Sequence, residues 1–193
     1  MQCMQELTIH RRRRAWGKLI MDKTRLMQRA IELSRSSLER PGTRPYAAVV
    51  VRNGEIVGEG LNHADANFDP TSHGEIEAIR DACRNLKTTD LAGCELYTSC
   101  EPCILCVATM YRAGIEKLYF AASRDQHMAL MAREEQSFGQ AVGTAFDSDE
   151  VARQAIKPPL RRSMPAEQMM ADDALAALDA WWVHQRGGSA GKF

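Results

Sequence analysis

Two short segments carry residue types that bind metals and move protons, His73-Gly74-Glu75 and Pro102-Cys103-Ile104-Leu105-Cys106. Cys103 and Cys106 are three residues apart, so on one helical turn both sulfur atoms can face a single point. With an imidazole nitrogen of His73 they make three ligands that suit zinc. Zinc with three protein ligands keeps a fourth position for water, as catalytic sites do. The spacing therefore predicts one catalytic Zn²⁺ per chain.

Glu75 has the chemistry of a proton shuttle beside such a metal. It lies two residues past His73 in the same predicted helical turn, where it can face the metal without binding it. One carboxylate can take a proton from zinc-bound water, pass it to a ring nitrogen and later help to protonate a departing amine. The pair of motifs, H-x-E and P-C-x-x-C, resembles the signature of zinc-dependent deaminases, which implies hydrolytic release of ammonia from an amidine carbon.

Two other interpretations of these residues stay open. Ser72 and Glu75 match a capping box, in which the carboxylate would only cap a helix. Cys100 lies three residues before Cys103, so His73 and three cysteines could close a structural zinc site with four protein ligands. In that case the chain would be a zinc-stabilised binding module without catalytic activity.

Alternating helices and strands must position these residues. Helical spacing of apolar residues predicts helices over 22–38, 73–86, 103–113, 125–134, 149–156 and 166–185. Apolar runs predict strands over 46–51, 55–61, 94–99 and 117–122. Asn53-Gly54 predicts a tight hairpin between the first two strands. The first strand is apolar on both faces, which indicates a sheet covered by helices on two sides, and we expect the last helix to dock on the core.

Composition is that of a globular protein, with 193 residues, no net charge and 45% hydrophobic residues. Five basic residues and one acidic residue in 1–21 predict a flexible basic extension, followed by one domain over 22–186 and a flexible tail over 187–193.

Residues 22–193 hold 20 basic and 24 acidic side chains, which disfavours a nucleic acid partner. No apolar run is long enough to span a membrane, and cysteines without secretion features suit a reducing compartment, so we expect a cytoplasmic protein.

The two motifs, with their flanks, resemble the cytidine deaminase superfamily, and within it the bacterial guanine deaminase and tRNA adenosine deaminase branch. The resemblance covers roughly residues 26–125. It implies an α/β fold, a three-layer α/β/α sandwich around a mixed sheet of about five strands. It also implies zinc bound by His73, Cys103 and Cys106, with Glu75 as the proton shuttle and Cys100 outside the ligand set. The segments that carry it are Gly58-Glu59-Gly60-Leu61-Asn62, Asp69-Pro70-Thr71-Ser72-His73-Gly74-Glu75 and Tyr97-Thr98-Ser99-Cys100-Glu101-Pro102-Cys103.

The resemblance further implies substrate contacts. Asn62 is expected to hydrogen-bond the base, the backbone at Gly74 to hold a ring carbonyl, and Tyr46 to line the pocket. The sequence departs from the family pattern at several positions: Gly74 stands where Ala is usual, Tyr46-Ala47 replaces a common Phe-Gly, and Arg112 replaces an aromatic residue expected near the base. If Arg112 enters the pocket it would favour a carbonyl-rich or anionic ring; otherwise it is an exposed helix residue.

We therefore expect deamination of a free nucleobase or related aminated heterocycle, with guanine first, by a homodimer that has no membrane partner. The alternative enzyme edits adenosine in tRNA, and against it stands an acidic C-terminal helix with Asp172, Asp173 and Asp179. In some guanine deaminases the C-terminal segment lies across a partner subunit and covers its active site. The tail that ends in Phe193 is a candidate for that role.

Overall fold

The computed structural model describes residues 22–138 and 147–187, which fall into two compact units that divide after Thr144. The predicted basic extension over 1–21, and residues 188–193 of the predicted tail, lie outside the described residues. The first unit contains, in chain order, α2 (Lys23–Arg35), η1 (Ser36–Glu39), β1 (Arg44–Arg52), β2 (Glu55–Asn62), α3 (Gly74–Leu86), β3 (Cys94–Cys100), α4 (Ile104–Ala113), β4 (Lys117–Ala122) and α5 (Arg124–Phe138).

The sheet of the first unit has four strands in the order β2-β1-β3-β4. β1 pairs antiparallel with β2 and with β3, whereas β3 and β4 are parallel, so the predicted mixed sheet is confirmed. Within the described residues the sheet has four strands, against the expected number of about five. The Asn53-Gly54 hairpin also forms, and both residues have the positive φ angles, 53° and 76°, that such a tight turn requires.

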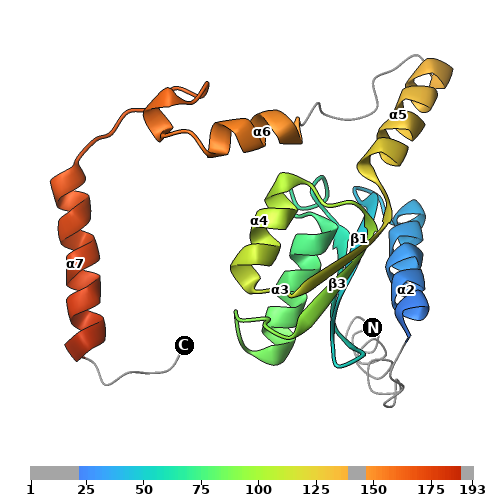
Figure 1. The fold of residues 1–193 in the computed structure, drawn as a ribbon, viewed down its shortest axis with the longest axis horizontal. Helices are drawn as coiled ribbons and strands as arrows, with labels where there is room; N and C mark the ends of the chain where they lie inside the picture. The colour runs from blue at the N-terminus through green and yellow to red at the C-terminus, as the bar shows by residue number, and fades with distance from the viewer. Residues whose placement is uncertain (1–21, 139–146, 188–193) are drawn as a thin grey trace, which may run out of the picture. The chain divides into compact units, whose positions relative to one another are not determined.

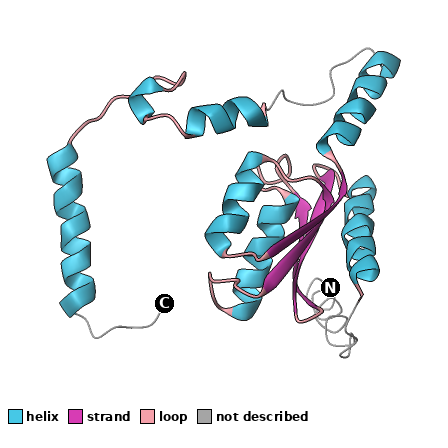
Figure 2. Ribbon diagram, in the orientation of Figure 1, coloured by secondary structure: helices cyan, strands magenta, loops and turns pink. Residues whose placement is uncertain are grey.

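Helices cover both faces of the sheet, as Figures 1 and 2 show. Alternate residues of β1 point to opposite faces. Ala48 and Val50 pack in a cluster that includes residues of α3 and α4, whereas Val49 and Val51 pack with Leu26 of α2. The predicted three-layer α/β/α arrangement, with a first strand buried on both faces, is thereby confirmed.

Two glycines of β2 bring α3 close to the sheet. A Cβ atom at Gly58 would collide with the carbonyl oxygen of Ala78, and a Cβ atom at Gly60 would collide with that of Gly74. Only glycine permits this approach. It brings the first turn of α3 close to the end of β2, where Asn62 lies.

The second unit contains α6 (Ser148–Ala155), η2 (Pro159–Arg161) and α7 (Ala171–Gly187). Asp147 caps α6 by accepting hydrogen bonds from the backbone of Asp149 and Glu150. Large apolar side chains of α7 are exposed, among them Trp181 and Trp182. The expectations that this helix docks on the core, and that residues 22–186 form one domain, stay predictions. Within 22–138 and 147–187, no helix combines the length and the apolar character needed to cross a membrane.

Candidate metal centre

Two helices begin at the candidate site, and each begins with a candidate metal ligand. His73 is the N-cap residue of α3 and Cys103 is the N-cap residue of α4, both in an extended conformation. Neither side chain makes a capping hydrogen bond, so both are available for another partner. Cys106 follows within the first turn of α4 and is buried.

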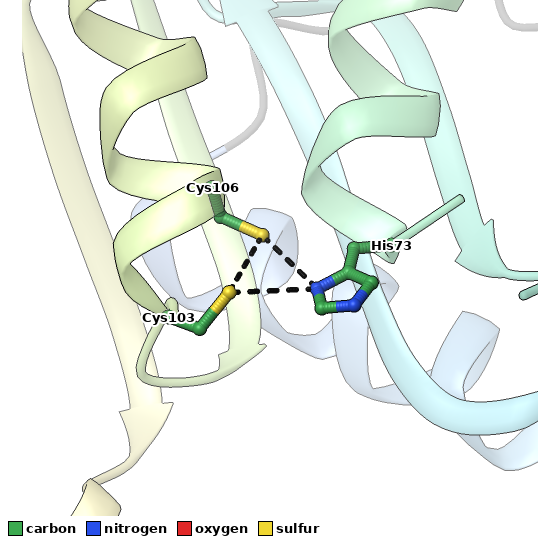
Figure 3. A group of neighbouring side chains, drawn as sticks. All are labelled: His73, Cys103 and Cys106. Atoms are coloured by element: carbon green, nitrogen blue, oxygen red, sulfur yellow. Dashed lines mark hydrogen bonds between the residues drawn. The ribbon is translucent and has the colours of Figure 1, made fainter. Parts of the chain in front are cut away.

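The three predicted ligands meet at one point (Figure 3). Nδ1 of His73 lies 3.5 Å from Sγ of Cys103 and 3.4 Å from Sγ of Cys106, and the two sulfur atoms are 3.6 Å apart. Tetrahedral zinc with ordinary Zn–N and Zn–S bond lengths separates such ligand atoms by about 3.5 to 3.8 Å. The side chains are therefore already spaced to hold a zinc ion.

Cys100 does not join this group. In the part of the chain that the structure describes, the metal-binding group consists of His73, Cys103 and Cys106. The arrangement therefore favours an open site with three protein ligands over a closed structural site with four.

The three ligands share protons with one another. The hydrogen bond between Cys103 and Cys106 lowers the pKa of Cys103 to about 4 and raises the pKa of Cys106. A hydrogen bond with Cys103 also raises the pKa of His73. The lowered pKa of Cys103 favours its thiolate form, whose negative charge suits a cation at the centre of the group.

Glu75 lies beside the metal ligands and is only 5% exposed. Its Oε2 atom is 3.4 Å from Sγ of Cys106, and its Oε1 atom is 3.3 Å from the hydroxyl of Thr98. Burial raises the pKa of this carboxyl group. The capping-box interpretation is not supported by these contacts, because Glu75 faces the metal group and the Ser72 hydroxyl instead donates to Glu77 at 2.8 Å.

Thr98 is a site residue that the sequence analysis did not single out. It lies in β3 and is fully buried, and its hydroxyl is also 3.3 Å from the carbonyl oxygen of Ala47 and 3.1 Å from that of Cys100. Its single hydroxyl proton therefore lies within reach of Glu75 and of one backbone carbonyl each from β1 and β3. The sequence feature that could have indicated Thr98 is a polar residue in a predicted strand, directly after core residues such as Leu96 and Tyr97.

Asn62 is 3% exposed at the end of β2. It lies two and four residues beyond Gly60 and Gly58, which contact α3, and so shares their face of the sheet. Its Oδ1 atom accepts a hydrogen bond from the backbone N–H of Ala64 at 3.1 Å. The side-chain NH₂ is therefore the end of the amide that can donate a hydrogen bond to a ligand.

Gly74, between His73 and Glu75, packs directly on β1. A Cβ atom there would lie 2.5 Å from the carbonyl oxygen of Tyr46 and 2.8 Å from Cα of Ala47. Tyr46, Gly74 and Asn62 are therefore brought to the region of the metal group. Arg112 is not: it is exposed in the last turn of α4, six residues or about 9 Å of helix beyond Cys106, and its substrate contact stays a prediction.

A polar network holds the loop that leads into α3. Arg80 lies 2.6 Å from Glu77, and Glu77 in turn accepts the hydrogen bond from Ser72. The other end of the Arg80 guanidinium reaches the hydroxyl of Thr71 at 3.2 Å, and Asp69 accepts from the backbone and the hydroxyl of Thr71. These contacts tie the residues before His73 to the second turn of α3.

Residues 21–122 match the family model of the cytidine and deoxycytidylate deaminase zinc-binding region. The chain is 31% identical over 161 residues to the guanine deaminase of Bacillus subtilis. The aligned region covers 83% of this chain and 94% of that protein. It is 38% identical over 107 residues to the tRNA-specific adenosine deaminase of Aquifex aeolicus, spanning 55% of this chain and 70% of that protein. The crystal structure of the B. subtilis guanine deaminase superposes with a TM-score of 0.71 and 29% identity, over 90% of this chain and 98% of that one.

Proposed function

The chain belongs to the cytidine and deoxycytidylate deaminase family that shares a zinc-binding region, and is a zinc-dependent hydrolytic deaminase; we propose that its physiological substrate is a free guanine base. The main support is the extent of the likeness to guanine deaminase, which reaches through nine-tenths of the chain. The likeness to the tRNA-specific enzyme of A. aeolicus covers about half of it. Guanine has an amino group on an amidine carbon, C2, as the reaction requires.

The donors that face the substrate region suit a ring with hydrogen-bond acceptors. The side-chain Oδ1 atom of Asn62 accepts from Ala64, which leaves the NH₂ as the end of the amide that can donate to a substrate. Gly74 is the first residue of α3, and a helix leaves its first N–H groups without partners inside the helix. Two donors in this position can hold a carbonyl oxygen and a ring nitrogen of a purine.

The ligand set formed by His73, Cys103 and Cys106 fits zinc, which supplies Lewis acidity and an acidified water when bound. The buried carboxylate of Glu75 does the proton transfer. Its Oε1 atom is held by Thr98, so Oε2, on the side of the metal ligands, is the atom that takes a proton from water and gives it to a ring nitrogen. A second transfer from the same carboxyl lets the amino group leave as ammonia.

The balance of the reaction is simple. Water adds to C2 of guanine, a carbon–oxygen bond forms, and the carbon–nitrogen bond to the amino group breaks. The products are ammonia and xanthine, and no electron acceptor is needed. Burial of Glu75 favours this chemistry because its raised pKa lets the carboxyl hold the proton between the two transfers.

Ammonia release from a panel of bases tests the proposal. Guanine, isocytosine, cytosine, adenine and the corresponding nucleosides are compared with a tRNA that carries adenosine in its anticodon. We expect guanine to give the highest kcat/KM, and Glu75→Gln to lower kcat by at least about 10³-fold, as loss of an essential acid–base group does, while the zinc content stays at one ion per chain. Faster turnover of the tRNA would replace guanine deamination with the alternative.

Three further features belong to the same proposal. The enzyme acts as a homodimer, and the C-terminal tail of one subunit covers the active site of the other. Its location is the cytoplasm, because Cys103 and Cys106 bind zinc only while their thiols stay reduced. Nucleic acid is not a partner in this proposal, since α7 presents acidic Asp172 and Asp173 in its first turn.

A further inference from the structure

The first turn of α5 is hydrogen-bonded to the loop before α4, which ends at the metal ligand Cys103. Ser123 and Gln126 cap the helix reciprocally: the Ser123 backbone donates to the Gln126 side chain at 2.9 Å, and the Gln126 backbone lies 3.2 Å from the Ser123 hydroxyl. The backbone N–H of Arg124 donates to Glu101 at 2.8 Å, and the N–H of Glu101 donates to Ala122. Glu101 lies two residues before Cys103, so the start of α5 is fixed next to the site.

His127 lies in this first turn of α5 and contacts Tyr46. Nε2 of His127 lies 2.9 Å from the Tyr46 hydroxyl, and the two rings meet edge to face with centroids 5.5 Å apart. Both side chains are half-buried. In the described part of the chain, this hydrogen bond joins residues 81 positions apart and connects β1 directly with α5.

The backbone of Tyr46 borders the reaction site. Its carbonyl oxygen lies against Gly74, between the metal ligand His73 and the proton shuttle Glu75. Burial raises the pKa of the Tyr46 hydroxyl, and the nearby Cys100 adds to the rise. The hydroxyl is therefore neutral, and it shares one hydrogen bond with an imidazole that also holds the ring in place.

We propose that His127 is a positioning residue for substrate binding: it fixes the Tyr46 ring as one wall of the base pocket and thereby sets the affinity for the base. The inference rests on the proposed function, because it assumes that a base binds beside Glu75. It also explains one departure from the family pattern, in which a phenylalanine is common at position 46. A phenylalanine has no hydroxyl for His127 to hold, so the tyrosine and the histidine act as a pair.

A double-mutant cycle tests the pair. His127→Ala, Tyr46→Phe and the double variant are assayed for kcat and KM with the base that the wild type deaminates. We expect each single change to raise KM about three- to tenfold, the usual effect of one lost hydrogen bond, with kcat within about twofold. The double variant should be no worse than the more impaired single variant, because both changes remove the same contact. His127→Gln, whose amide can reach the hydroxyl, should recover part of the affinity.

Met128→Ala is the matched control, since Met128 is the next residue of α5 and is exposed. It should leave KM unchanged, and all variants should keep one zinc ion. Unchanged KM in His127→Ala, additive effects in the double variant, or an equal loss in Met128→Ala would each overturn the inference.

Equilibrium binding separates this inference from the proposed function. Guanine is titrated into zinc-loaded Glu75→Gln protein, with and without His127→Ala, so that no turnover is required. If guanine binds and His127→Ala weakens that binding, the role of His127 in positioning Tyr46 is supported. This holds even where the wild-type enzyme deaminates guanine slowly. If guanine does not bind but another base of the panel does, guanine is the wrong substrate and that base is titrated in the same way. If no base binds, both proposals fail.

Discussion

At the scale of single residues, the site is built from side chains that are hydrogen-bonded to one another. The hydrogen bond between Cys103 and Cys106 lowers the pKa of Cys103, and the carboxylate of Glu75 lies between Cys106 and Thr98. The sequence motifs predicted the ligands and the carboxylate, since metal ligands must be close together and helix spacing makes them so. Thr98 was not predicted, because its role depends on the pairing of β1 with β3. A local sequence pattern does not show which strands pair.

The hydroxyl of Thr98 should matter for rate and not for metal binding. Thr98→Val keeps the shape of the side chain but removes the hydrogen bond to Glu75. We expect kcat to fall about tenfold, in line with the loss of a hydrogen bond to a charged group, while the zinc content is unchanged. Thr98→Ser, which keeps the hydroxyl, should stay within about threefold of the wild type. A Thr98→Val enzyme as fast as the Thr98→Ser enzyme would show that the contact does not position Glu75.

At the scale of elements, the site depends on how closely α3 lies against β1 and β2. Helix and strand positions followed from apolar spacing, because periodic burial is a local property of the sequence. The α3–β1 approach could be recognised only in part, from a glycine at position 74 where the family usually has alanine. The Tyr46–His127 contact could not be predicted, since it joins two elements far apart in the chain.

Positions 47 and 74 should be coupled through β1. A methyl group added by Gly74→Ala must push β1 toward α2, but the methyl group of Ala47 is fully buried in a cluster with Leu33 of α2. We expect Gly74→Ala to destabilise the zinc-loaded protein by about 1–3 kcal/mol, as overpacking does, and to lower activity. The measurement is thermal or chemical unfolding together with kcat/KM.

The second variant decides whether the coupling is real. Ala47→Gly/Gly74→Ala has room for β1 to move, because the blocking methyl group is gone. It should therefore be more stable than the sum of the two single effects predicts. Strictly additive losses would mean that the methyl group of Ala47 does not limit the position of β1.

At the scale of the whole molecule, the described chain has two units, and the reacting groups all belong to the first. The similarity to guanine deaminase continues into the second unit, because it covers nine-tenths of the chain. The sequence predicted helices there, but not what their exposed apolar side chains pack against, since amphipathic spacing indicates a buried face without naming its partner.

Deletion of residues 187–193 tests the role proposed for the tail. If the tail covers a neighbouring active site, KM for the base should rise by about tenfold or more, the typical effect of losing one or two contacts, while the zinc content is unchanged. Unaltered kinetics in the deletion variant would reject the covering role and leave the metal centre unaffected.

X-ray absorption spectroscopy at the zinc edge tests the open metal centre, on which the account depends, most directly. For the purified wild-type protein we predict two sulfur ligands and two lighter ligands, from Cys103, Cys106, His73 and one exchangeable water. The Cys100→Ala variant should give the same spectrum. Three sulfur ligands in the wild type, reduced to two in Cys100→Ala, would mean a closed site with four protein ligands and would contradict the proposed hydrolysis.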